Sequence, residues 1–280
     1  MKKSKLKQKK KVPLWVIITL FLLFFVILVI GLFLFYDWRK DNREIKKLNK
    51  VLDEIVTIED KEVPVEETQF VNPPVEEKES DYWYYVHLPF KEVDFTSLLD
   101  RNKDTVGYIH MENTNINYPI VSSGDNEYYL NHDFNKKSNK AGWIFLDYRN
   151  NLDNLSDNTV IYGHGRIDNT LFGSLKKVLT NSWQKNKENY VIRISTPKEN
   201  MLFQIFSVYT IDAESYYITT NFVRPERKIK WIEDMKERNI APINTEVSVE
   251  DKILTLSTCQ NNNGKRIVVH AKLIKKETRS

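Results

Sequence analysis

The hydrophobic pattern divides the chain into an apolar run near its start and a longer part in which short apolar runs alternate with polar turns. The apolar run covers residues 12–36 and precedes the first acidic residue, Asp37. Its length exceeds the roughly 20 residues that a helix needs to cross about 30 Å of hydrocarbon. The pattern therefore predicts a transmembrane helix over residues 13–36. A cleaved signal peptide is the alternative, but the run is long for one and no Ala-x-Ala site follows it.

Residues 37–80 change from a helical pattern to an acidic one that contains prolines. Apolar residues recur at helical spacing from Ile45 to Ile55, which predicts either a helical stalk or a helix packed against the following domain. Residues 59–79 contain three prolines and many carboxylates, a composition that does not bury a core. We expect them to form an extended, solvated linker that holds the rest of the chain away from the bilayer.

Residues 81–280 contain mostly short strand-like runs, separated by turns rich in Asn, Asp, Gly or Pro. Strands are predicted at residues 106–110, 116–121, 141–146, 159–162, 190–195, 201–211, 252–258 and 266–274. Two short helices are predicted at residues 94–100 and 171–179. About 200 residues with eight strands and few helices suit one mainly β domain, built as a closed barrel or a sandwich.

Charge and composition limit the class of protein further. Seven lysines among the first eleven residues precede the predicted span, so the positive-inside rule places residues 1–12 in the cytoplasm and the rest outside. The net charge of +4 includes these lysines, so the remainder is slightly acidic and offers no basic patch for nucleic acid. A single cysteine fits an exported protein without disulfides. The histidine and cysteine spacing predicts no metal site, and no cofactor is expected.

The only cysteine, Cys259, ends the seventh predicted strand. Alternation along that strand places Ser257 on the same face as Cys259. The Asn263-Gly264 pair favours a tight turn, after which Arg266 begins an antiparallel partner strand. Arg266 is then expected roughly 5–8 Å from Cys259 across the ladder. A lone cysteine is most often a small buried hydrophobe. A neighbouring cation, however, lowers the pKa of a thiol and stabilises an oxyanion, so Cys259 is a candidate nucleophile.

A thiol that attacks a carbonyl also needs an acid for the leaving group, and His164 is the best candidate. It lies between two glycines at the end of the fourth predicted strand, where the backbone can turn and the imidazole is not crowded. A lone histidine is as often structural. The remaining histidines lie in loops or at ordinary strand positions: His87, His110, His132 and His270.

Two short runs and one arginine resemble the catalytic signature of the sortases. They are Tyr162-Gly-His164, Thr255-Leu-Ser-Thr-Cys259 and, shortly after, Arg266. Sortases are membrane-bound cysteine transpeptidases of Gram-positive bacteria. The resemblance implies that Cys259 is the nucleophile, that His164 is the acid, and that Arg266 binds the substrate or the oxyanion.

Further stretches are similar to the class B branch of this family: residues 106–121, 126–134 and 142–147. A helix before the cysteine-bearing strand is another class B feature, and residues 224–239 fit it with Pro225 at the helix start. The resemblance implies an eight-stranded sortase-type β-barrel with a few peripheral helices over residues 81–280, preceded by one transmembrane helix.

The implied reaction cleaves a C-terminal sorting signal of a secreted protein after threonine and leaves a thioacyl enzyme. An amine of the peptidoglycan precursor, or a pilin lysine, then receives the protein. Ser257 and Thr258 are candidate substrate-binding residues, although Ser257 is as readily a small packing residue. The implied location is the cell membrane, with the catalytic domain outside.

Three alternatives remain open from the sequence. A cysteine hydrolase would use the same residues and release free acids. A pilin-polymerising sortase would differ only in its amine nucleophile. A non-catalytic membrane-anchored binding module would contain a buried, unreactive Cys259. The class B resemblance favours a sorting signal of the Asn-Pro-x-Thr type over the Leu-Pro-x-Thr-Gly type.

Overall fold

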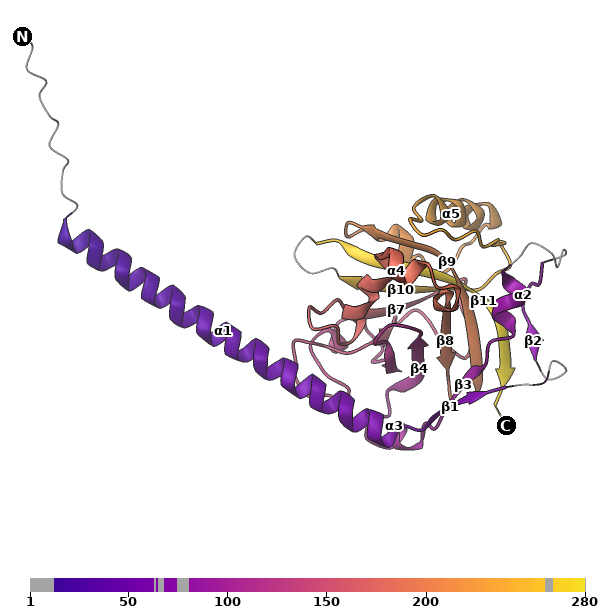
Figure 1. Cartoon of the computed structure of the whole chain (residues 1–280), viewed down its shortest axis with the longest axis horizontal. Helices are drawn as coiled ribbons and strands as arrows, with labels where there is room; N and C mark the ends of the chain where they lie inside the picture. Colours follow the sequence, from indigo (N-terminus) through magenta and orange to yellow (C-terminus); the bar gives the residue numbers. More distant parts are fainter. Residues whose placement is uncertain (1–12, 63, 65–67, 75–80, 260–263, 280) are drawn as a thin grey trace, which may run out of the picture. The chain divides into compact units, whose positions relative to one another are not determined.

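The computed structural model describes residues 13–62, 64, 68–74, 81–259 and 264–279, with only the backbone of Cys259 (Figure 1). The chain divides into two compact units, one up to residue 44 and one from residue 45 onward. The first unit consists of most of helix α1 (Leu14–Ile55). Its apolar window has a mean hydropathy of 3.3 and exposed side chains, so α1 is long and apolar enough to cross a membrane.

The second unit is built on a closed β-barrel. Its strands are β4 (Thr105–Met111), β5 (Asn117–Val121), β6 (Phe145–Leu146), β7 (Asn158–His164), β8 (Val191–Ser195), β9 (Glu199–Ile211), β10 (Ile253–Cys259) and β11 (Arg266–Thr278). They follow the order β10-β7-β6-β5-β4-β8-β9-β11, and pairing of β10 with β11 closes the sheet. The β10–β7 and β5–β6 pairs are parallel, and the other pairs are antiparallel. The eight-stranded barrel predicted from the sequence is confirmed.

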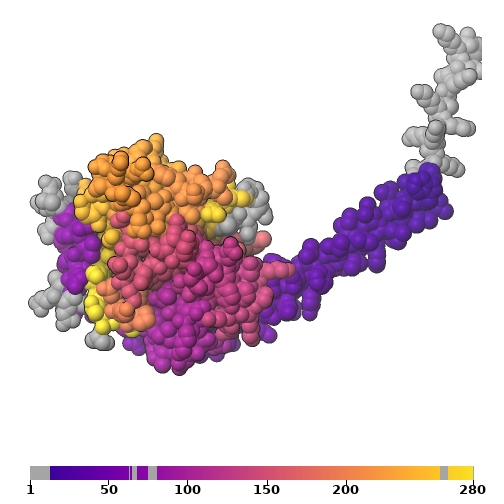
Figure 2. All heavy atoms as spheres, turned by 180° about the vertical axis from the view of Figure 1, so that it is seen from behind, coloured from indigo at the N-terminus to yellow at the C-terminus, as the bar shows by residue number. Residues whose placement is uncertain are grey.

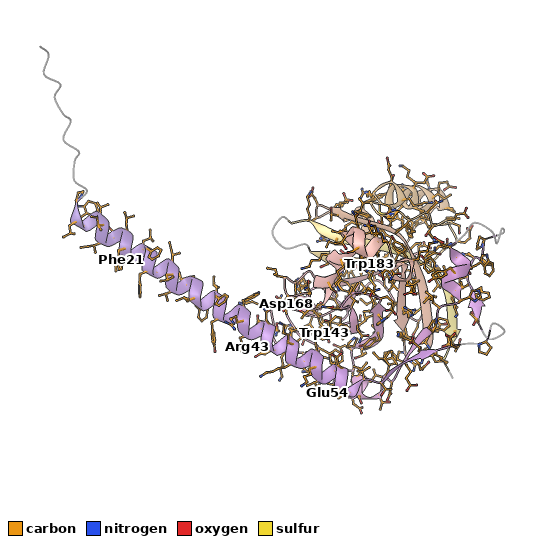
Figure 3. All side chains as sticks on the ribbon, viewed as in Figure 1. Phe21, Arg43, Glu54, Trp143, Asp168 and Trp183 are labelled. Carbon is orange, nitrogen blue, oxygen red and sulfur yellow. The ribbon has the colours of Figure 1, made fainter. Side chains whose placement is uncertain are left out.

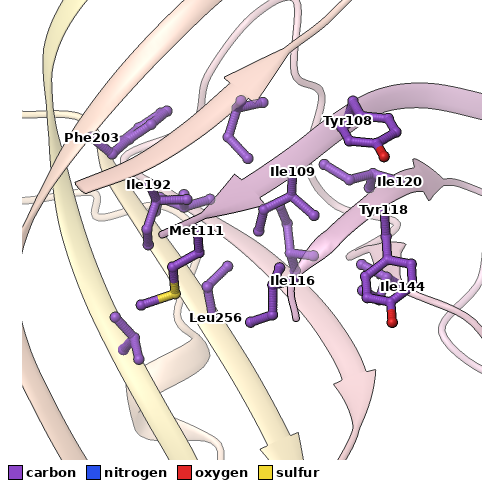
Figure 4. Close-up of a cluster of buried hydrophobic side chains, with 14 of the residues drawn as sticks. Tyr108, Ile109, Met111, Ile116, Tyr118, Ile120, Ile144, Ile192, Phe203 and Leu256 are labelled. Carbon is purple, nitrogen blue, oxygen red and sulfur yellow. The ribbon is translucent and has the colours of Figure 1, made fainter. Parts of the chain in front are cut away.

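Side chains from alternate strand positions fill the barrel interior (Figure 4). The close-up shows residues of several strands in one cluster, and all of them are almost completely buried: Ile109, Met111, Ile116, Ile120, Ile192, Phe203 and Leu256. Burial of each such side chain contributes about 1.5–3 kcal/mol. Trp143 and Trp183, labelled in Figure 3, are also buried. The barrel is thus a packed core, and the surface at its strand ends is where chemistry can take place.

Short helices surround the barrel. They are α2 (Tyr82–Val86), α3 (Thr96–Arg101), η2 (Tyr128–Leu130), η3 (Phe172–Leu179), α4 (Asn181–Gln184), η4 (Lys187–Tyr190) and η5 (Tyr216–Ile218). The longest of the barrel helices, α5 (Pro225–Glu237), begins with proline in its first turn and buries Trp231, Ile232 and Met235 in a second cluster with Phe206. Its residues lie in the orange surface at the top of Figure 2. The helices predicted at residues 94–100, 171–179 and 224–239 are all present, the second as a 3-10 helix.

None of the described residues of the predicted linker, 59–62, 64 and 68–74, is buried, but two short strands keep this segment on the domain. Ile45, Leu48 and Leu52 are buried within the second unit, so the end of α1 packs on the domain. Strand β1 (Ile58–Lys61) pairs with β3 (Phe90–Val93), and β2 (Gln69–Phe70) pairs with β11.

Edge strands and ion pairs keep the acidic segment on the domain. Lys61 lies within 3.3 Å of Glu92 and within 3.2 Å of Glu277, so the acidic segment pairs with charges on the domain. An exposed sheet edge also offers backbone groups to any neighbouring strand, whatever its composition. Residues 63, 65–67 and 75–80 of the predicted linker, and the basic tail at residues 1–12, lie outside the described residues.

Candidate active site

Three neighbouring strand ends bring together the candidate catalytic residues. Cys259, the last residue of β10, is the backbone partner of His164 on parallel β7 and of Arg266 on antiparallel β11. Neighbouring strands lie about 4.8 Å apart, so the three backbones stand side by side at one end of the barrel. The predicted position of Arg266 across the ladder from Cys259 is confirmed. Gly264 has φ +69° as a tight turn requires, whereas Asn263 lies outside the described residues.

A cavity of about 240 Å³ opens at these strand ends. Four residues singled out in the sequence line it: His164, Ser257, Thr258 and Arg266. The other lining residues were not proposed as site residues, although all but Ile218 lie in stretches that carry the family resemblance: Asn126, Leu130, Phe145, Tyr162, Gly163 and Ile218. They come from β6, β7, η2 and the segment before it, and η5, so only the folded chain shows that they share one cavity. Mainly apolar walls with a few polar groups are typical of a ligand-binding pocket.

His164 is half-buried at the rim of this cavity. Its Nε2 lies 3.0 Å from the carbonyl oxygen of Leu130, a distance at which a protonated Nε2 donates a hydrogen bond. The neighbouring Gly142 has φ +62°, and a Cβ there would lie 2.8 Å from Cδ2 of His164. A Cβ on Gly163 would instead meet the Phe172 ring at 2.8 Å. The glycines therefore permit close packing around the histidine as well as a change of chain direction.

Tyr217 connects the arginine to the cysteine-bearing strand. Its ring is completely buried, and its hydroxyl oxygen accepts a hydrogen bond from Nη1 of Arg266 at 2.9 Å. The same hydroxyl lies 2.9 Å from Oγ of Ser257, which is 3% exposed. Because the tyrosine oxygen accepts from the guanidinium, its proton is available to Ser257. This contact orients the Arg266 side chain, and it also gives Ser257 a structural partner.

The other histidines of the barrel have structural partners. His110 contacts Asn117 at 3.2 Å and Glu112 at 3.1 Å, and the His132 ring stacks on Tyr128. His270 is completely buried. Within the described residues, no group of three or more His, Cys, Asp or Glu side chains could hold a metal ion.

Tyr217 was missed in the sequence because two adjacent tyrosines stand in a short polar segment, and nothing local indicates which one points inward. Asn126 was not proposed as a site residue either, because its neighbours in sequence are those of an ordinary polar loop. Their positions depend on how separate segments pack, which a hydrophobic pattern does not record.

Comparison with known proteins identifies the family. The model described as Sortase domain matches residues 109–274. Sortase B of Staphylococcus aureus is 38% identical over 193 residues, covering 68% of this chain and 78% of that protein. Sortase B of Listeria monocytogenes is 31% identical over 264 residues, covering 89% of this chain and 95% of that protein.

Solved structures agree with this assignment. A Staphylococcus aureus sortase B–substrate complex matches with a TM-score of 0.60 and 37% identity, covering 65% of this chain and 84% of that chain. A crystal structure of sortase B complexed with triglycine matches with a TM-score of 0.61 and 37% identity, covering 65% of this chain and 85% of that chain. The chain therefore belongs to the sortase family of cysteine transpeptidases, in its class B branch.

Proposed function

We propose that this class B sortase is a membrane-anchored enzyme that cleaves a C-terminal sorting signal after threonine and transfers the protein to an amine of the peptidoglycan precursor. The observation that carries the proposal is the backbone register, in which Cys259 pairs with both His164 and Arg266. A related sortase B has been solved with a substrate and another with triglycine, which supports a peptide donor and an amine acceptor.

In the first half-reaction, the thiolate of Cys259 attacks the threonine carbonyl carbon. The carbonyl electron pair moves to oxygen, and the guanidinium of Arg266 donates hydrogen bonds to the resulting oxyanion or to a neighbouring substrate carbonyl. A single preorganised donor of this kind contributes about 2.7–4 kcal/mol, or 10²–10³ in kcat.

His164 supplies the proton that lets the amine leave. An imidazolium carries a proton on each ring nitrogen, so one nitrogen can remain bonded to the Leu130 carbonyl while the other gives up its proton. The carbon–nitrogen bond then breaks, and a thioester between threonine and Cys259 remains. In the second half-reaction, neutral His164 removes a proton from the incoming amine, which attacks the thioester and releases the thiolate.

Ser257 and Thr258 are proposed to bind the substrate, because both line the cavity next to the cysteine. An Asn-Pro-x-Thr type of signal is the proposed substrate, with the Leu-Pro-x-Thr-Gly type as the second choice. The apolar part of α1 is proposed as a single membrane span, with the lysine-rich N-terminus in the cytoplasm and the barrel outside.

Peptide panels with the full chain in detergent micelles test the proposal. Each peptide carries one sorting motif, and intact mass spectrometry follows the enzyme with Cys259→Ala as the control. We expect a mass increase equal to the acyl fragment only in the enzyme that retains Cys259. A Cys259→Ala enzyme that cleaves at a near wild-type rate would remove the cysteine from the mechanism. Absence of any adduct or cleavage with every peptide would favour the binding module.

A further inference from the structure

The buried carboxylate of Asp147 lies behind the cavity and is surrounded by donors. Asp147 follows β6 and is 0% exposed. Its Oδ1 accepts hydrogen bonds from the backbone N–H of Arg149 at 3.0 Å and from Nε of Arg149 at 2.8 Å. Its Oδ2 accepts from Nη2 of Arg149 at 2.7 Å, from the Tyr162 hydroxyl at 2.8 Å and from Nδ2 of Asn126 at 3.2 Å. A carboxylate with this many donors is held in one orientation.

Asp147 and Arg149 together connect three walls of the cavity. Asn126 comes from the segment before η2, and Tyr162 comes from β7. The third wall is reached through Arg149, whose Nη2 also donates to the carbonyl oxygen of Ile218 in η5 at 3.1 Å. Asn126, Tyr162 and Ile218 all line the cavity. The three walls are far apart in sequence, and the Asp147–Arg149 pair links them directly.

The electrostatics fix the direction of every hydrogen bond in this network. Burial alone would raise the pKa of Asp147, but the hydrogen bonds and positive charge of Arg149, with the Tyr162 hydroxyl, bring that pKa below its ordinary value. Burial and the negative charge of Asp147 raise the pKa of Tyr162 well above its ordinary value. Asp147 therefore stays ionised and Tyr162 stays protonated, so the tyrosine always donates. Asn126 is fixed at both ends, because its Oδ1 accepts from the backbone N–H of Tyr148 at 3.0 Å.

We propose that Asp147 is a positioning residue that shapes the peptide-binding wall of the cavity and so sets the affinity for the sorting signal, not the reactivity of the thiol. Its carboxylate accepts hydrogen bonds from Asn126 and Tyr162 of the wall and from Arg149, which holds the Ile218 carbonyl. The Arg266 guanidinium is instead bonded to Tyr217, and His164 contacts Leu130. With its amide held by Asp147 and Tyr148, Asn126 presents its second N–H in a fixed direction, suited to a carbonyl of an extended peptide. This inference rests on the proposed peptide substrate.

Asp147→Asn tests the inference, because it keeps the shape and removes the charge that organises the donors. Asp251→Asn is the matched control. Asp251 is also 0% exposed, and it accepts bonds from Asn72, the Ser248 backbone and Lys272, all of which lie at a different cavity. Both variants lose a buried charge–charge contact, so both are expected to have a lowered Tm.

The kinetic result expected for Asp147→Asn is a KM for the sorting peptide at least about tenfold higher, because the wall loses the charged acceptor that fixes Asn126 and Tyr162 in position for the peptide. The kcat and the rate of Cys259 alkylation by iodoacetamide should stay within about threefold of wild type. Asp251→Asn should leave KM within about twofold. An equal rise of KM in both variants would mean general destabilisation and would overturn the inference. Slower alkylation with unchanged KM would place Asp147 with the nucleophile instead.

Arg149→Lys gives a second test in case the asparagine variant does not fold. Lysine keeps the positive charge, but an ammonium does not span both carboxylate oxygens and the Ile218 carbonyl as a guanidinium does. We expect a KM rise of about threefold or more with unchanged alkylation. Wild-type KM in this variant would contradict the inference.

Hydrogen exchange separates this inference from the proposed function. In Asp147→Asn or Arg149→Lys, amide exchange of Tyr148 and of residues 216–219 should accelerate at least about tenfold, while Asp251→Asn leaves both unchanged. Exchange that is unchanged in these variants would overturn the positioning role whether or not a peptide is cleaved. If the wild-type enzyme cleaves no sorting peptide, the proposed function fails, and the exchange data still decide whether Asp147 organises the wall.

Discussion

Tyr217→Phe should impair catalysis without disturbing the core. The phenylalanine ring fills the space of the buried tyrosine, so the substitution creates almost no cavity, and only the hydroxyl that contacts Arg266 and Ser257 is lost. A hydrogen bond to a charged group contributes about 1.5–3 kcal/mol. If that energy holds the guanidinium where the oxyanion develops, its loss lowers kcat/KM by roughly 10- to 100-fold.

Steady-state cleavage of the sorting peptide, together with thermal unfolding, measures this effect. Tyr216→Phe is the control, because the neighbouring hydroxyl bonds to Asp234 at the surface at 2.9 Å and is remote from the arginine. The control should keep kcat/KM within about twofold. Ser257→Ala should have a smaller effect than Tyr217→Phe if the tyrosine acts through the arginine.

A double-mutant cycle gives the refuting result. In an Arg266→Ala background, Tyr217→Phe should have little further effect on kcat/KM, because its partner is already absent. Fully additive effects would show that Tyr217 acts independently of Arg266. A Tyr217→Phe enzyme with wild-type kcat/KM would refute the positioning argument outright.

The remaining predictions concern catalysis, pH and truncation. His164→Ala and Arg266→Ala should each lower kcat/KM at least ~100-fold, and a small Arg266 effect would assign the oxyanion donor to another cation. Burial, with the positive charge of Arg238, lowers the pKa of His270 from 6.5 to about 3. The unfolded chain therefore binds this proton below about pH 6.5 and the folded chain does not, so stability should fall by about 2 kcal/mol between pH 6.5 and 4.5. Urea unfolding measures this loss, and His270→Gln should reduce it. Removing residues 1–80 should lower the Tm by roughly 10 °C relative to a fragment that starts at residue 45, because the burial of Ile45, Leu48 and Leu52 and the pairing of β1 and β2 are lost. A fragment that starts at residue 56 keeps both strands and separates the two contributions. Equal Tm values for the fragments that start at residues 45 and 56 would mean that this helix does not stabilise the barrel.

The sequence predicted the strands well because they carry their own signals, whereas the choice of a closed barrel over a sandwich came from the family resemblance. Period-2 alternation and turn residues located all eight strands, and the turn signal before Arg266 predicted its position opposite Cys259. These are local relations between residues close in sequence. Proline at the first turn likewise predicted the start of α5.

Contacts between residues far apart in sequence could not be predicted from these local patterns. His164 reaches Cys259 through the parallel β7–β10 pair, and no local pattern specifies which strands pair in parallel. The family resemblance supplied that relation. Tyr217 and Asp147 make side-chain hydrogen bonds to residues far away in sequence, and such contacts leave no period in the sequence. The strand pairing of the acidic linker was not foreseen, because composition describes what a segment can bury by itself and not which edge strand it can join.

The most direct test of the central claim is the fate of the acyl group on Cys259. The full-length enzyme is incubated with its best sorting peptide, with and without an oligoglycine or diamino acid nucleophile, and the products are identified by mass spectrometry. We expect cleavage after threonine and an amine-linked product that replaces the free acid as the amine concentration rises. Free acid alone at every amine concentration would contradict transpeptidation and indicate a hydrolase.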